Sequence, residues 1–191
     1  MTEPLLVDVP EQIRTERLLV RAPRAGDGPA VHAAVVESFA ELNRWMEWAR
    51  VQQTAEESEL FVRRSAAEFA ARVNLNMLLF LHDGTFVGGS GMHHIDWSVP
   101  RFEIGYWCRT SLAGRGYIRE AVTALTWMAF ETLGAARVEV RMDTLNERSW
   151  RVAERLGFTL EGVLRSDARA NDGQLRDTRV YALTALADLK P

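Results

Sequence analysis

The sequence predicts one α/β domain in which a mixed β-sheet has helices packed against parts of both faces. Two β-rich runs flank Asp83-Gly84, a dipeptide typical of a tight hairpin turn. A long segment with helical spacing of its apolar residues, Gly114 to Leu133, follows the next β-rich run. Helical and strand-like segments then alternate toward the C-terminus, and this order favours a mixed sheet with partly covered faces.

The N-terminal part predicts one strand followed by two helices. Arg17 to Arg21 alternates weakly and is expected to form the strand. Pro29 comes directly after Gly26-Asp27-Gly28 and is typical of the first turn of a helix. The expected apolar residues of that helix are Val31, Val35 and Phe39. Thr54 and Glu57 have the spacing of a capping box and predict the start of a second helix. Its apolar side would carry Leu60, Phe61 and Phe69.

The central part predicts three strands and a long helix. We expect strands over Leu75 to His82, Thr85 to His94 and Phe102 to Cys108, the first two joined at Asp83-Gly84. The helix from Gly114 to Leu133 would end before Gly134. Its expected buried side consists of Ala121, Leu125, Met128 and Ala129.

The C-terminal part predicts a strand, a helix and a final hairpin. Arg137 to Met142 alternates as a strand, and Glu147 to Leu156 is helical and ends before Gly157. Phe158 to Val163 and Thr178 to Leu183 are the expected final strands. They would be connected by a turn, Asn171-Asp172-Gly173.

The composition is that of an ordinary globular protein. The 191 residues are 47% hydrophobic and 26% charged, and no repeat or Pro/Gly/Ser-rich linker divides them. We therefore expect residues 1–191 to form a single domain. The longest apolar run, Met77 to Leu81, is far shorter than the roughly 20 residues that cross a bilayer, so no membrane association is expected. The net charge of −3 and the scattered arginines make nucleic acid an unexpected direct partner.

The single cysteine indicates a reducing compartment. Cys108 has no second cysteine with which to form an internal disulfide. The N-terminal residues also lack the basic segment and apolar stretch of a secretory signal. Both features favour a cytoplasmic protein.

A glycine-flanked turn opens the long helix and predicts an anion-binding site. Phe102 to Cys108 leads into this turn, which contains Gly114-Arg115-Gly116. Unpaired amides of the first helical turn and the positive end of the helix dipole suit a diphosphate, while glycines let its oxygens approach the backbone. The missing third glycine excludes a dinucleotide fingerprint, and the missing Gly-Lys-Ser/Thr excludes a Walker loop. An ordinary strand-to-helix turn remains the alternative.

A second segment of interest begins the last helix. Asn146 is a typical N-cap residue, and Ser149 would lie in the first turn near the end of the preceding strand. Capping alone would also explain Asn146. Leu156-Gly157-Phe158 and Glu161-Gly162 follow.

In combination these motifs resemble a known family. Glu103-Ile104-Gly105-Tyr106-Trp107 with Gly114-Arg115-Gly116, Asn146-x-x-Ser149, Leu156-Gly157-Phe158 and Glu161-Gly162 is similar to the ribosomal-protein N-terminal acetyltransferases of the GCN5-related N-acetyltransferase (GNAT) superfamily. Thr15-Glu16-Arg17-Leu18 and the segment from Gly162 to Leu183 extend the resemblance over nearly the whole chain.

The resemblance implies a GNAT fold, with a mostly antiparallel, V-splayed sheet flanked by helices. Phe102 to Cys108 and Arg137 to Met142 would be the two strands that diverge to receive the pantetheine arm of acetyl-coenzyme A. The implied cofactor-binding residues are Trp107, Cys108, Arg109, Gly114, Arg115, Gly116, Tyr117, Ile118, Asn146 and Ser149. Ala113 and Ile118 depart from the family pattern, so a side-chain contact at 113 would be lost and the packing at 118 would be looser.

Two residues are candidates for acid and base catalysis. Ser149 matches the serine that would protonate the leaving thiolate, with a purely structural hydroxyl as the alternative. Glu103 lies on the strand expected to face cofactor and substrate, and it could remove the proton of the amine directly or through water. A solvated or arginine-paired glutamate is the alternative. Backbone amides near Trp107 and Cys108 could stabilise the thioester oxygen.

Other reactive residues are given structural interpretations. A nucleophilic Cys108 is disfavoured because no base with the required spacing is visible. His93, His94 and Asp96 suggest a metal site, but strand alternation would let only His94 and Asp96 converge, so no metal is expected. One histidine would pack while the other lines a cleft, and either could relay protons. The residues Trp45, Met46 and Trp48 would either wall an acceptor groove or pack in the core.

The resulting functional hypothesis is acetyl transfer from acetyl-coenzyme A to a protein or peptide N-terminal α-amine by direct attack. A polyamine, an amino acid or an aminoglycoside is the alternative acceptor, and a non-catalytic acyl-coenzyme A sensor is the alternative class of protein. RNA binding has little support from the charge distribution. The edge created by the last hairpin could pair two subunits into a homodimer.

Overall fold

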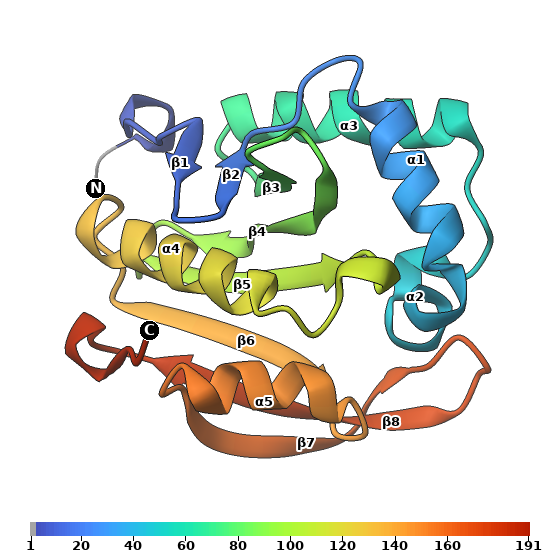
Figure 1. The fold of residues 1–191 in the computed structure, drawn as a ribbon. Coiled ribbons are helices and arrows are strands. Elements are labelled where there is room, and N and C mark those ends of the chain that lie inside the picture. Colours follow the sequence, from blue (N-terminus) through green and yellow to red (C-terminus); the bar gives the residue numbers. More distant parts are fainter. Residues whose placement is uncertain (1–2) are drawn as a thin grey trace.

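The structure, a computed structural model, describes residues 3–191 and contains one eight-stranded sheet flanked by five α-helices (Figure 1). The helices are α1 (Gly28–Glu37), α2 (Phe39–Trp45), α3 (Ala55–Ala70), α4 (Tyr117–Glu131) and α5 (Glu147–Arg155). The strands are β1 (Gln12–Arg14), β2 (Leu18–Arg21), β3 (Leu75–Leu81), β4 (Phe86–Asp96), β5 (Arg101–Cys108), β6 (Arg137–Asp143), β7 (Thr159–Arg169) and β8 (Leu175–Leu183). The mixed α/β class predicted from the sequence is confirmed.

The strand order is β1-β2-β3-β4-β5-β6-β8-β7. All neighbours are antiparallel except β5 and β6, which are parallel. These two strands pair only at their first three residues, from Arg101 with Arg137 to Glu103 with Glu139. Beyond that point they separate, so the predicted V-shaped splay is present. The parallel pair is therefore where the sheet opens.

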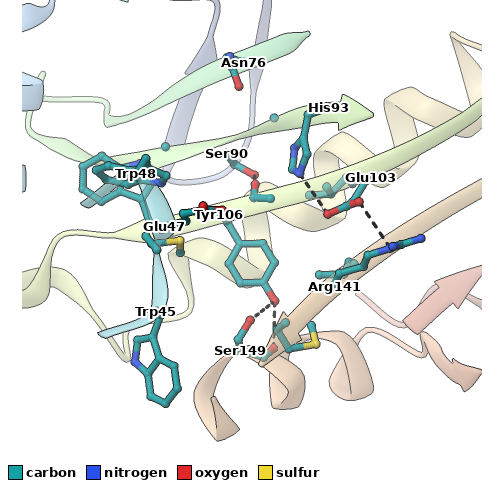
Figure 2. A pocket seen from close by; sticks show the side chains of 18 of the residues that line it. Trp45, Glu47, Trp48, Asn76, Ser90, His93, Glu103, Tyr106, Arg141 and Ser149 are labelled. Carbon is teal, nitrogen blue, oxygen red and sulfur yellow. Dashed lines mark hydrogen bonds and ion pairs between the residues drawn. The ribbon is translucent and has the colours of Figure 1, made fainter. Parts of the chain in front are cut away.

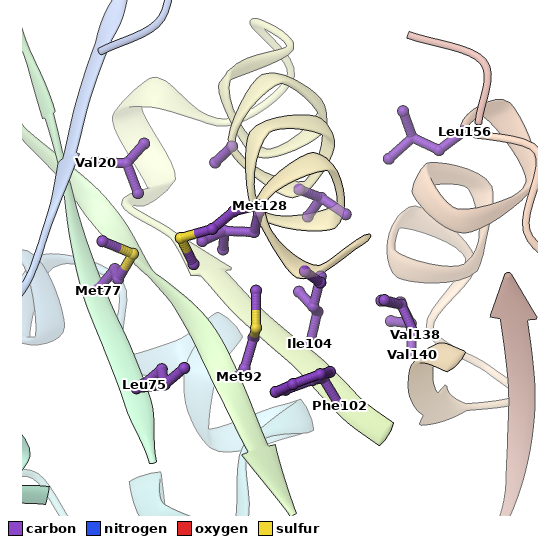
Figure 3. Packing of buried hydrophobic residues seen from close by; sticks show 14 of the residues in the cluster. Val20, Leu75, Met77, Met92, Phe102, Ile104, Met128, Val138, Val140 and Leu156 are labelled. Atoms are coloured by element: carbon purple, nitrogen blue, oxygen red, sulfur yellow. The ribbon is translucent and has the colours of Figure 1, made fainter. Parts of the chain in front are cut away.

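Alternating side chains divide the core between the two faces of the sheet. The larger apolar cluster lies beneath α4 and α5 and includes Met92, Phe102 and Ile104 (Figure 3). A smaller cluster, which includes Leu78 and Phe80, lies against α1 and α3. Burying each large apolar side chain contributes roughly 1.5–3 kcal/mol. The core therefore holds β5 and β6 in place up to the point where these two strands diverge. Figure 1 shows α4 and α5 in front of the sheet.

Several local predictions are confirmed by hydrogen bonds. Thr54 and Glu57 form the expected capping box of α3. The Leu81 amide donates to the Thr85 carbonyl (2.8 Å) and closes the hairpin at Asp83-Gly84. Gly134 and Gly157 follow α4 and α5 with the positive φ angles of 65° and 84° that favour glycine.

Other bounds differ from the prediction for reasons of tertiary structure. The first helix is divided at Ser38, whose buried hydroxyl accepts a hydrogen bond from the Thr110 amide (2.9 Å) and so ties α1 to the turn after β5. The long helix begins at Tyr117 rather than Gly114, because Gly114 and Gly116 have left-handed φ angles of 78° and 83°. β4 continues two residues beyond His94 through a bulge.

The remaining differences lie at the two ends of the sheet. β1 was missed because three residues carry too little periodicity to be read as a strand. β7 extends to Arg169 instead of ending at Val163, since its polar second half pairs with β8. β7 is also the edge strand of the sheet. Within residues 3–191, no helix combines the length and apolar character needed to span a membrane.

Candidate active site

The point where β5 and β6 diverge is marked by a cluster of charges. Glu103 and Glu139 are directly opposite each other in the last register pair, and two carboxylates in this position repel each other. Arg141 relieves the repulsion, with guanidinium nitrogens 3.6 Å from a Glu103 oxygen and 3.0 Å from a Glu139 oxygen. Arg141 therefore stabilises the point where β5 and β6 separate.

Beyond the vertex, alternate backbone groups of β5 face the gap. The Arg109 amide donates to the Val87 carbonyl of β4 (2.7 Å), and hydrogen-bonding direction alternates along an antiparallel strand. Trp107 therefore belongs to the β4–β5 ladder, while the backbone groups of Tyr106 and Cys108 face the opening. The amides of Trp107 and Cys108 are the two candidates for binding the thioester oxygen. Only the Cys108 amide points toward the gap between β5 and β6.

The turn before α4 has the geometry predicted for an anion site. Gly114 and Gly116 take left-handed φ angles, and helix α4 starts directly after them. Among residues 3–191, no acceptor is found for the amides of residues 114–119. Arg115 and Arg119 are both exposed beside these amides. A diphosphate can therefore accept hydrogen bonds from the backbone and pair with an arginine.

A clamp missed by sequence reasoning holds this turn in place. The Glu120 carboxylate accepts hydrogen bonds from the Thr15 hydroxyl (2.6 Å), the Arg17 amide (2.8 Å) and the Arg17 guanidinium (2.6 Å). Arg17 also donates to the Arg115 carbonyl (3.0 Å). The clamp gives a physical role to the Thr15-Glu16-Arg17-Leu18 motif, since it anchors the turn to the N-terminal strands.

The other residues considered for cofactor binding near this turn differ in exposure and in the groups that they contact. Arg109 points away toward α1, where its guanidinium contacts Glu37 (2.6 Å). Ala113 is exposed. Tyr117 and Ile118 are half-buried and pack against the larger core cluster, so the isoleucine is accommodated.

Ser149 and Tyr106 meet on the α4 and α5 side of the gap. Asn146 caps α5 as predicted, accepting a hydrogen bond from the Ser149 amide (3.2 Å). The Ser149 hydroxyl does not cap the helix but donates to the Tyr106 hydroxyl (3.1 Å), which donates in turn to the Ser149 carbonyl (2.9 Å). Burial raises the pKa of Tyr106 to about 12, so the phenol stays protonated. Sequence reasoning missed Tyr106 because no local pattern reports this contact.

Glu103 lies on the opposite face of the sheet, where it contacts His93 (Figure 2) and His94. Its oxygens lie 3.2 Å from His93 Nε2 and 2.9 Å from His94 Nδ1. Burial acts to raise the pKa of Glu103, but hydrogen bonds from the two imidazoles outweigh it, so this pKa lies below its ordinary value. The expected convergence of His94 with Asp96 is therefore wrong, because the bulge turns His94 toward Glu103. The ligand-type atoms of this trio lie within 4.8 Å of one another, but Arg141 already supplies a positive charge to Glu103.

The Cys108 side chain is unsuited to nucleophilic attack. It is a free, partly buried thiol that packs against the larger core cluster. Burial raises the pKa of Cys108 to about 11, so little thiolate exists at neutral pH. This agrees with the structural interpretation of the cysteine.

A cavity of about 610 Å³ connects these groups. The residues that line it include Ser149 and Tyr106 from one side of the gap and Glu103 and His93 from the other. Trp45 and Trp48 also line the cavity (Figure 2), as does Met46, which packs against the smaller core cluster as well. The Asn171 side-chain amide donates to the carbonyls of Asn43 (2.7 Å) and Met46 (2.9 Å), which ties the β7–β8 hairpin to the end of α2 beside the cavity.

Comparison with known proteins identifies the class. A family model described as an acetyltransferase (GNAT) domain matches residues 17–159, most of the chain. The chain therefore belongs to the GNAT acetyltransferases, which transfer an acetyl group from acetyl-coenzyme A. This agrees with the glycine turn before α4 and with the splayed strands, and the predicted fold and enzyme class are confirmed.

Three individual proteins illustrate this similarity. The ribosomal-protein-serine acetyltransferase of Escherichia coli (strain K12) is 27% identical over 141 residues, covering 74% of this chain and 78% of that protein. A structure of RimL, titled a ribosomal L7/L12 α-N-protein acetyltransferase in complex with coenzyme A, is 26% identical with a TM-score of 0.86, covering 93% of this chain and 100% of that one. RimJ of Mycobacterium smegmatis, in complex with a coenzyme A disulfide, is 25% identical with a TM-score of 0.80, covering 88% of this chain and 82% of that one.

Proposed function

We propose that this enzyme acetylates the N-terminal α-amine of a protein or peptide in the cytoplasm. The acceptor would be of the ribosomal-protein kind, as the names of RimL and of the Escherichia coli relative state for those proteins. The amine attacks the thioester carbonyl directly. The C–N bond forms, the C–S bond breaks, and the departing sulfur takes a proton.

The observation that carries this proposal is that Ser149 reaches one opening in the sheet, the gap between β5 and β6, from the α5 face, while Glu103 and His93 reach it from the other. Donor and acceptor can therefore enter from different sides and meet at the splay, where the Cys108 amide faces the developing oxyanion. The amides of residues 114–119 would hold the pyrophosphate of acetyl-coenzyme A.

The acceptor side of the cavity suits a peptide main chain better than a compact amine. It extends from Trp45 and Trp48 at the end of α2 to Asp167 and Arg176 on the β7–β8 hairpin. Apolar walls can take the first side chains, while groups of both charge signs can contact an amine and peptide groups. We also propose that two subunits pair through the β7 edge to form a homodimer. Light scattering over a range of protein concentrations measures the molar mass that tests this.

Acetyl transfer to a panel of amines tests the acceptor. We expect mass spectrometry to show one added acetyl group on peptides that have a free N-terminus. The same peptides with a blocked N-terminus and an internal lysine should remain unmodified, as should spermidine and an aminoglycoside. Acetylation of the small amines with no peptide product would contradict the proposed acceptor. Binding of coenzyme A without turnover of any amine would instead indicate a sensor.

A further inference from the structure

A strained bulge in β4 brings two adjacent histidines to one carboxylate. His93 is the register partner of Glu103, so their side chains share a face of the sheet. His94 would point to the other face of a regular strand, but it has a left-handed φ angle of 48° at a register shift. A left-handed φ angle in a residue other than glycine is uncommon, and backbone strain of this kind is concentrated at functional sites. The bulge has re-aimed His94 beside the cavity.

The hydrogen bonds define which atoms can accept a proton. An ionised carboxylate is only an acceptor, so His93 Nε2 and His94 Nδ1 must each carry the hydrogen that points at Glu103. A neutral imidazole has one N–H, and its other nitrogen then has a free lone pair. Glu103 therefore fixes the tautomers of both rings.

We propose that His93 is the catalytic base that deprotonates the acceptor ammonium, and that Glu103 is a positioning residue that stays ionised. The inference rests on the proposed acetyl transfer to an amine. The ammonium proton moves to the free nitrogen of His93, and the lone pair left on the amine attacks the thioester carbonyl. The resulting imidazolium keeps its hydrogen bond to Glu103, whose negative charge stabilises it. The proton later leaves to water through the cavity.

The surroundings favour His93 over Glu103 as the base. Glu103 is a weak proton acceptor at neutral pH because its pKa is held below the ordinary value. An imidazole exchanges protons close to neutral pH, where a general base is most effective. Arg141 adds a positive charge near Glu103 and further discourages its protonation.

Position favours His93 over His94. His93 is 33% exposed and lies over Gly105 of β5, whereas His94 is 76% exposed. A Cβ atom at position 105 would lie 2.6 Å from His93 Cε1, so the glycine makes room for this ring beside the gap. The titratable and charged groups around His93 are Glu103 on β5, His94 on β4 and, through Glu103, Arg141 on β6. Other charged residues lining the cavity are Glu47, Asp143, Asp167 and Arg176.

The pH dependence of kcat tests the assignment with three matched variants. The wild type should lose kcat on the acidic side as His93 becomes protonated. His93→Gln keeps a donor for Glu103 but should lower kcat roughly 10²-fold or more and remove this acidic limb. His94→Gln, the control at the neighbouring position, should keep the limb. Glu103→Gln should keep the limb but move its midpoint to lower pH, because the imidazolium loses an opposite charge.

Other results would assign the base differently. An acidic limb that persists in His93→Gln, or disappears in His94→Gln or Glu103→Gln, would overturn the inference. Unchanged acetyl-coenzyme A affinity in each variant verifies that it is folded. Any primary amine acetylated by the wild type serves for these profiles, so failure of the N-terminal peptides would concern the proposed acceptor only.

A second measurement needs no acceptor. The chain has four histidines, so their ring protons can be assigned by NMR with single substitutions. In the resting protein, the His93 resonances should titrate at lower pH in Glu103→Gln than in the wild type. Identical titration in the two proteins would contradict the coupling of His93 to Glu103, whatever the acceptor is.

Discussion

Ser149→Ala is expected to lower kcat about 10²-fold while the dissociation constant of acetyl-coenzyme A stays nearly unchanged. In the proposed mechanism this hydroxyl protonates the leaving sulfur, and its interaction with the sulfur strengthens only as the sulfur gains negative charge. An interaction confined to the transition state affects kcat rather than ground-state binding. The hydrogen bond from this hydroxyl to the Tyr106 oxygen (3.1 Å) holds the hydroxyl beside the gap. Steady-state kinetics and calorimetric binding measure the two quantities separately.

Two further variants control this experiment. Ser98→Ala removes a hydroxyl from an exposed turn after β4 and should leave kcat unchanged. Tyr106→Phe removes both the acceptor of the Ser149 hydroxyl and the donor to the Ser149 carbonyl, so kcat should fall there as well. Full kcat in Ser149→Ala at every pH would mean that the serine is structural and that water protonates the thiolate.

Gly105→Ala should lower kcat by about 10² with little change in acetyl-coenzyme A affinity. The new methyl group would lie 2.6 Å from His93 Cε1, so the ring must shift from its present position. A displacement of about 1 Å in a catalytic group is enough for a loss of this size. Overpacking should also cost about 1–3 kcal/mol of stability, which is measured by denaturant unfolding.

Gly162→Ala is the matched control for this substitution. A Cβ atom at position 162 on β7 would have no neighbour within 4 Å, and the residue does not need a positive φ. Its kcat should equal that of the wild type. If Gly105→Ala retained full kcat with a displaced His93 ring in its crystal structure, His93 would have no direct part in the reaction.

Features encoded by neighbouring residues could be predicted from the sequence. The capping box at Thr54, the cap at Asn146 and the turn at Asp83-Gly84 each depend on residues within a few positions. The left-handed turn at the glycines before α4 likewise depends only on local backbone geometry. Such features need no knowledge of which strands pair, so single-sequence reasoning is sufficient for them.

Features made by pairing of distant segments could not be predicted in this way. Tyr106 contacts Ser149 only because α5 packs beside the gap, and Glu120 meets Arg17 only because α4 crosses the first strands. The error at His94 has a similar origin. Strict alternation failed there because Glu103, on the neighbouring strand, accepts a hydrogen bond from the re-aimed ring. A bulge of this kind is stabilised by tertiary contacts and has no signal in its own residues.

A crystal structure with a bisubstrate ligand measures most directly whether acetyl transfer occurs in the opening between β5 and β6. The ligand would join the sulfur of coenzyme A through an acetyl bridge to the α-nitrogen of a short peptide. We predict the sulfur within hydrogen-bond distance of the Ser149 hydroxyl, the bridging carbonyl at the Cys108 amide, and the peptide nitrogen on the opposite face beside His93. A pantetheine arm outside this opening, or sulfur and nitrogen on the same face of the sheet, would contradict the proposed site.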